Sequence, residues 1–170
     1  MNRSSSLVLT GGALCAALGV LTFIDVPDRL WMLAAAGFCA LIAAGLGLTG
    51  GPYRPAAIAF AIFGVAHIVC SFDLDLPPIV LSPGLVVVLV GLAITGVKVL
   101  NEGMVQGGSR YVPLIVSATC ITMPMGHMLF GDTGHQASII LLGIAFAALA
   151  LPLAQVRQSR PLDAIHAGRA

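Results

Sequence analysis

Two histidines lie inside long segments without any charged residue, and their side chains are the ones in this chain best suited to chemistry. Asp73 follows His67 by six residues, and Asp132 follows His127 by five. An imidazole titrates near neutral pH and can act as a general acid or base. A histidine beside a carboxylate can therefore pass protons to and from a substrate. We predict His67, His127, Asp132 and Asp73 as the catalytic residues.

The same side chains are also metal ligands. Cys120, Met123 and His127 follow one another at i, i+3 and i+7, which places them on one face of a helix. Thiolate, thioether and imidazole groups bind copper or zinc. We predict a catalytic site without a cofactor, and a copper or zinc site at these three residues is the alternative. Two facing imidazoles would also suit a haem iron. A structural role stays open too, since histidines in membranes often only hydrogen-bond a neighbouring helix.

Six charge-free segments must position these side chains, and each is long enough to cross a hydrocarbon core, which takes about 20 apolar residues. They cover residues 4–24, 30–53, 55–72, 76–97, 111–131 and 133–156. The chain is 58% hydrophobic and 9% charged, whereas soluble domains carry about 25% charged residues. We predict an all-α membrane protein of six transmembrane helices with short loops. Residues 1–157 form one domain, and residues 158–170 form a polar cytoplasmic tail.

Basic residues indicate how the chain crosses the membrane. Only Arg29 falls on the side away from the N-terminus, and the other basic residues share the N-terminal side: Arg3, Arg54, Lys98, Arg110, Arg157, Arg160 and Arg169. Lys and Arg accumulate on the cytoplasmic side. We therefore predict a cell (inner) membrane protein with both termini cytoplasmic. The net charge of +1 gives no indication of a nucleic-acid partner.

In this topology the membrane histidines gather at one depth. His67 and His127 lie in the outer halves of parallel spans, and His135 begins the last span on the same side. A neutral imidazole in a membrane needs a hydrogen-bonding partner or a water-filled pocket. We expect His67 and His127 to face one cavity that opens toward the outer surface.

Small residues and a proline predict how the helices pack. Pro124 removes a backbone hydrogen bond within segment 111–131 and predicts a kink there. Small side chains let membrane helices approach closely, so segment 30–53 is predicted to lie at the centre of the bundle. Its small residues form two stripes at four-residue spacing: Ala36, Ala40 and Ala44, and Ala43, Gly47 and Gly51.

The segment around His67 resembles a motif of the lysoplasmalogenase-like (YhhN-type) membrane family. It reads Phe63-Gly-Val-Ala66-His67-Ile-Val-Cys70-Ser-Phe72, which is similar to the family pattern F-x-x-[AS]-H-x-x-Y with a nearby Phe. The resemblance implies a helical membrane hydrolase that cleaves the vinyl ether of a lysophospholipid substrate.

Two further stretches are similar to the same family. Arg110–Met123 resembles the family's basic residue, proline and helix ending in Met, and Gly143–Arg160 resembles its final helix with a basic tail. Together with the His67 motif, the resemblance extends diffusely over residues 29–165.

The chain departs from the family at the residues that would do the chemistry. The family has eight helices, and this chain has six charge-free segments. The family's two carboxylates would fall in Leu41–Gly45 and near Ala150, where this chain has no acid, and its tyrosine is replaced by Cys70. Vinyl-ether hydrolysis needs an acid to protonate the enol ether and a base to direct water. His67, His127 or aspartates of the outer loops would have to supply both.

Two other classes of function stay open beside an ether-lipid hydrolase. A small transporter or channel would use the outer histidines as a proton- or metal-sensitive gate. A non-enzymatic membrane subunit would pack against other membrane subunits. Membrane lipids are partners of the chain in every case.

Overall fold

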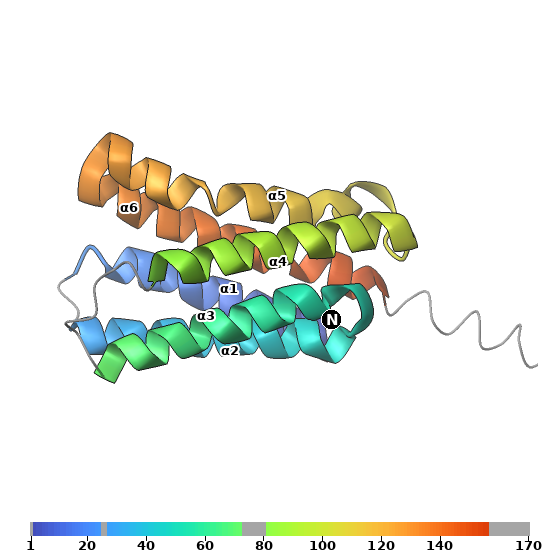
Figure 1. Ribbon diagram of the computed structural model, residues 1–170, viewed down its shortest axis with the longest axis horizontal. Helices are drawn as coiled ribbons and strands as arrows, with labels where there is room; N and C mark the ends of the chain where they lie inside the picture. The colour runs from blue at the N-terminus through green and yellow to red at the C-terminus, as the bar shows by residue number, and fades with distance from the viewer. Residues whose placement is uncertain (1, 25–26, 73–80, 157–170) are drawn as a thin grey trace, which may run out of the picture.

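The protein is an all-helical bundle, seen in a computed structural model that describes residues 2–24, 27–72 and 81–156 (Figure 1). The predicted catalytic Asp73 and the predicted tail 158–170 lie outside these residues. The long helices lie side by side along one axis. The helices are α1 (Arg3–Leu21), α2 (Asp28–Thr49), α3 (Arg54–Phe72), α4 (Leu81–Glu102), α5 (Val112–Thr119) and α6 (Thr122–Ala148), with short 3₁₀ helices η1 (Gly51–Tyr53) and η3 (Gly107–Tyr111).

The turn between the fifth and sixth predicted spans lies inside α6. Gly131 has φ 60° and ψ −143°, a backbone conformation that glycine adopts without a steric penalty. The chain reverses there and forms a hairpin with two arms, residues 122–130 and 132–148 (Figure 1). A further helical stretch continues the second arm to residue 156. The sixth predicted span is therefore the second arm with its continuation, and the fifth is made of α5 followed by the first arm.

The kink predicted from Pro124 is also present. Helix α5 ends at Thr119, and Cys120 and Ile121 form tighter turns before the first arm begins. Proline has no N–H to donate to the carbonyl oxygen of Cys120, four residues earlier, so the helical bonding fails at this place.

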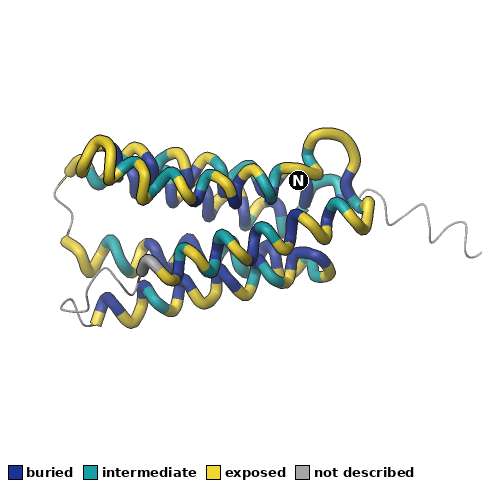
Figure 2. The backbone as a smooth tube through the Cα atoms, turned by 45° about the horizontal axis from the view of Figure 1, so that its top comes forward, coloured by how far each residue is buried: buried dark blue, intermediate teal, exposed yellow. Residues whose placement is uncertain are grey.

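The length and composition of these helices suit a membrane. Five helical segments in the described part of the chain are long and apolar enough to span a bilayer, and one of them is the joined segment Thr122–Val156. Exposed and buried residues alternate along the helices (Figure 2). Many of the exposed positions carry large apolar side chains, such as Leu48, Ile58 and Ile144. The predicted fold class, an all-α membrane protein, is confirmed.

The helices close into a ring. Each long helix packs against its neighbours in sequence, and α1 packs against α6. Phe60 of α3 meets Phe146 of α6 edge to face, with ring centroids 5.0 Å apart. Leu92, Val116 and Leu149 are also buried. Large apolar side chains therefore fill the interior of the bundle.

The described chain begins and ends at the same end of the bundle. The Asn2 side-chain nitrogen Nδ2 donates to the carbonyl oxygen of Leu153 at 2.8 Å. Because of this contact, the chain must pass along the bundle an even number of times, as predicted. Arg3 and Arg54 lie at this basic end, and the Gly131 turn lies at the opposite end (Figure 1).

A labelling experiment tests which end faces the cytoplasm. Two exposed residues lie at opposite ends of the bundle: Asn101 close to the end of α4, and Asp132 beside the Gly131 turn. All four native cysteines are buried and should not react. We expect a membrane-impermeant maleimide to label Asp132→Cys in intact cells and to label Asn101→Cys only after permeabilisation. Labelling of Asn101→Cys in intact cells would reverse the predicted orientation.

The predicted packing stripes of α2 are present only in part. Ala36 is buried and Ala43 packs against the core. Ala40, Ala44 and Gly47 are exposed. The helix instead buries larger side chains, among them Cys39, Ile42 and Leu46. Small residues pack closely only where a partner backbone approaches them, and their spacing alone does not tell which stripe has such a partner.

Helices α1 and α6 approach each other closely at four small residues. A Cβ atom built on Gly12 would lie 2.6 Å from Cα of Ala147, and one built on Gly143 would lie 2.6 Å from Cα of Ala16. Each helix therefore contributes a glycine and an alanine four residues later, and each glycine faces the partner's alanine. This small-residue seam closes the ring.

Candidate functional site

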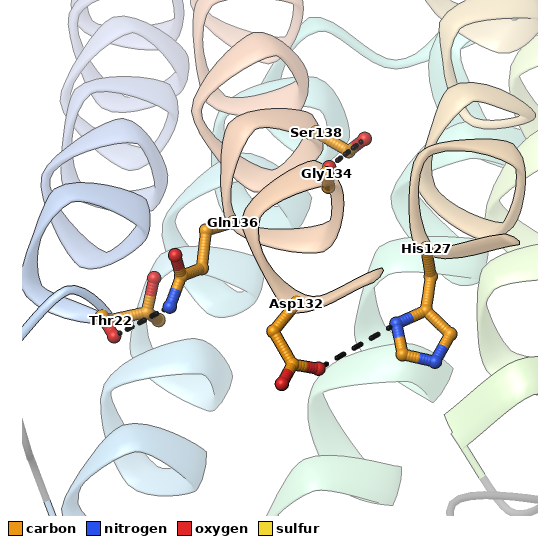
Figure 3. Close-up of polar contacts among 6 residues, drawn as sticks. All are labelled: Thr22, His127, Asp132, Gly134, Gln136 and Ser138. Atoms are coloured by element: carbon orange, nitrogen blue, oxygen red, sulfur yellow. Dashed lines mark hydrogen bonds and ion pairs between the residues drawn. The ribbon is translucent and has the colours of Figure 1, made fainter. Parts of the chain in front are cut away.

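A pair of facing glycines brings the candidate site together. Gly126 lies on the first arm of the α6 hairpin and Gly134 on the second. A Cβ built on Gly126 would lie 2.7 Å from the carbonyl oxygen of Gly134, so glycine is needed for the arms to approach this closely. The Ser138 hydroxyl secures the contact. It lies 2.8 Å from the carbonyl oxygen of Gly134 (Figure 3) and 3.0 Å from that of Thr122.

The residue after each glycine is a histidine. The rings of His127 and His135 have centroids 5.7 Å apart and planes at 79°. Asp132, just past the Gly131 turn, places Oδ1 4.0 Å from Nδ1 of His127. Figure 3 shows these two side chains pointing toward one another across the hairpin. Two imidazoles and one carboxylate therefore lie together at one end of the bundle.

This cluster is open to its surroundings. The side chain of His127 is 60% exposed and that of Asp132 is 96% exposed, whereas His135 is half-buried. The 4.0 Å separation exceeds hydrogen-bond length, so a water molecule or a small rotation of either side chain would complete the pair. Such an arrangement can hold a proton on one imidazole and accept a proton on the carboxylate or the other imidazole.

The structure places His67 in a packed interface instead. Its side chain is 2% exposed, and Nδ1 lies 2.9 Å from the carbonyl oxygen of Phe63. The ring meets Phe63 edge-on at 4.4 Å and Trp31 of α2 at 5.9 Å. This is the structural role that the sequence left open, because backbone and aromatic neighbours surround the imidazole.

No contact joins His67 to His127 within the described residues. Neither residue lines the cavity beside Arg3 or the one between α3 and α4. The shared cavity therefore stays a prediction. His135, which the sequence placed at the same depth but not among the catalytic residues, takes the place beside His127. The signal for it was its spacing of eight residues across a turn that contains glycine.

Cys120 and His127, two of the predicted metal ligands, have different surroundings. Cys120 is buried with its Sγ 3.5 Å from the carbonyl oxygen of Val116, whereas His127 is exposed. The tight turns at Cys120 and Ile121 break the continuous helix on which the i, i+3, i+7 argument rested. Within residues 2–24, 27–72 and 81–156 no group of three or more His, Cys, Asp or Glu is arranged to hold a metal ion.

The glycine contact can be tested by widening it. Gly126→Val would place side-chain atoms against the Gly134 backbone and the Ser138 hydroxyl, at a cost of roughly 1–3 kcal/mol. We expect faster hydrogen exchange of the amides in residues 122–138 and a lower melting temperature. Gly37→Val is the matched control, because a Cβ on Gly37 meets nothing within 4 Å. Equal effects of the two substitutions would contradict a close approach of the arms.

The resemblance to the lysoplasmalogenase-like family stays a prediction from the sequence. The cluster at the Gly131 turn is the arrangement of side chains from which a function can be argued. Comparisons of the chain with protein-family models, with curated proteins and with solved structures found no match.

Proposed function

We propose that this protein is a membrane-embedded hydrolase of vinyl-ether lysophospholipids that uses His127, Asp132 and His135 as its acid–base groups. The observation that carries the proposal is the His127–Asp132 pair with the second imidazole beside it. The resemblance of the chain to the lysoplasmalogenase-like family supplies the substrate class.

The reaction needs a proton donor for the vinyl carbon and a proton acceptor for the attacking water, and the cluster has groups for both. A protonated imidazole gives its proton to the vinyl carbon farther from the ether oxygen, which leaves an oxocarbenium ion. Water then adds to the carbon bonded to oxygen, while Asp132 or the second imidazole takes the water's proton. Collapse of the hemiacetal then moves its hydroxyl proton to the glycerol oxygen, which gives a fatty aldehyde and a free glycerol hydroxyl. The sum is one water consumed and one carbon–oxygen bond cleaved.

The surroundings of the cluster favour a lipid over a soluble substrate. The same hairpin exposes Met128 (84%), Leu129 and Phe130 (73%). An apolar surface beside polar groups at the end of a membrane bundle suits an amphiphile, whose chain contacts the apolar side chains while its polar part stays at the interface. The site is accordingly proposed to bind substrate from the lipid phase.

The packed interior gives less support to a transporter or channel. Phe60 and Phe146 meet across the bundle, and the buried polar side chains in the described part are mostly engaged with backbone carbonyls. A conducting path needs polar groups that line water. The acid–base cluster therefore supports a hydrolase better than the packed interior supports a transporter or channel.

An assay with three lysolipids tests the proposal. The purified protein in lipid nanodiscs is given a vinyl-ether, a saturated-ether or an acyl lysophospholipid, and aldehyde release is followed with a coupled dehydrogenase. We expect aldehyde only from the vinyl ether, because only this bond is activated by protonation at carbon. Absence of aldehyde from folded protein would refute the proposed activity.

A further inference from the structure

A second candidate site lies at the basic end of the bundle, away from the histidine cluster. A cavity of about 270 Å³ opens there among α1, α2 and the end of the last span. It does not contribute to the proposed hydrolysis. Its lining residues are Asn2, Arg3, Ser4, Leu48, Thr49, Leu153 and Val156.

The lining combines a cation and hydroxyls with apolar walls. Arg3 and Ser4 supply donors, and no acidic side chain is among the lining residues within the part of the chain that the structure describes. A guanidinium presents a rigid fork of N–H groups that matches the oxygens of a phosphate. Leu48 and Leu153 form apolar wall beside these donors. A ligand that fits both parts is anionic at one end and apolar at the other.

The walls of the cavity are held in place by other contacts. Asn2 joins two of them, since its Nδ2 donates to Leu153 and its Oδ1 accepts from the backbone N–H of Ser5 at 2.7 Å. The Thr49 hydroxyl donates to the carbonyl oxygen of Gly45 at 3.2 Å. Asn2 and Thr49 are thus fixed by the protein. Among the described residues, the side chains of Arg3 and Ser4 are the lining donors that are available to a ligand.

We infer that this cavity binds a phosphate-bearing anion, the headgroup of an anionic phospholipid, through Arg3 and Ser4. The ends of a membrane bundle lie at the depth of lipid headgroups, and the basic residues of this end attract anionic lipid. Lipid phosphate is therefore the source to which the amphiphilic lining is suited. A soluble phosphate ester shares the anionic part of this chemistry but gains nothing from the apolar walls.

Native mass spectrometry of the whole protein tests this site. Protein released from detergent is titrated with phosphatidylglycerol and with phosphatidylcholine, and the retained lipid is counted. We expect preference for phosphatidylglycerol, and an affinity about tenfold lower in Arg3→Gln, since a charge-assisted hydrogen bond of about 1.5 kcal/mol is lost. Arg110→Gln is the control, because its guanidinium donates to the Tyr111 hydroxyl at 2.7 Å outside the cavity.

A second variant and a competitor make the outcomes distinct. Ser4→Leu fills the cavity and keeps the charge of Arg3, so it should weaken binding as well. Glycerol 3-phosphate at the concentration of the lipid should displace little phosphatidylglycerol, and full displacement would make the ligand a soluble phosphate ester instead of a lipid. Equal losses in Arg3→Gln and Arg110→Gln, or equal retention of both lipids, would overturn the site.

Discussion

Replacing Gly143 with leucine is expected to open the seam between α1 and α6 and to cause the largest loss of stability of any single substitution named here. The Cβ atom alone would lie against the backbone of Ala16, and a leucine adds three more carbons. Backbone cannot yield as a flexible side chain does, so we expect at least about 3 kcal/mol, the upper end of overpacking costs. Gly12→Leu meets Ala147 in the same way and should behave alike.

The control substitutions are Gly37→Leu and Gly47→Leu in α2. A Cβ on Gly37 meets nothing within 4 Å, and one on Gly47 comes no closer than 4.0 Å to Ala57. All of these positions are helical, so each variant gains about 1 kcal/mol of helix propensity. Because this gain is common to all of them, the difference in stability between the variants reports the packing alone. Melting temperatures of the variants in detergent measure this difference in stability. If Gly47→Leu lowered the melting temperature as much as Gly143→Leu, packing at α2 and not the seam between α1 and α6 would close the bundle.

The spans and the kink were predictable because each has a local physical cause. Charge-free windows follow from the cost of charge in hydrocarbon, and Pro124 breaks its helix whatever the neighbours are. Helix packing was not predictable in the same way. Ala40 and Gly47 of α2 have the spacing of a packed stripe but are exposed, and Gly12 and Gly143 acquire partners only when the first and last helices meet.

The histidines likewise divide into those that local sequence could place and those that depend on contacts between segments. His127 and Asp132 are five residues apart in sequence, and the Gly131 turn between them brings the side chains together, so local reasoning found this pair. His135 needed the facing glycines, which is a contact across the hairpin. Equal depth also grouped His67 with them, but depth does not say which way a side chain points. The contacts of His67 come from Phe63 and Trp31.

The second large effect is expected on catalysis, and it separates the two histidines. If His127 is an acid–base group, His127→Ala should lower kcat for vinyl-ether cleavage roughly 10²–10⁴-fold, the usual contribution of a positioned proton-transfer group. Asp132→Asn keeps the size of the side chain and removes its charge and basicity, so it should also lower kcat. Both side chains are exposed, so neither change should lower the melting temperature.

His67→Phe is the informative comparison. A phenyl ring can occupy the space between Phe63 and Trp31 and forfeits only the contact of Nδ1 with the Phe63 carbonyl oxygen. We expect kcat to stay within a few-fold of the parent protein. The opposite result, activity lost in His67→Phe and kept in His127→Ala, would move the chemistry to the motif that resembles the lysoplasmalogenase-like family. Because the structure surrounds the His67 imidazole with aromatic rings and exposes the His127 imidazole beside a carboxylate, we expect the chemistry at His127.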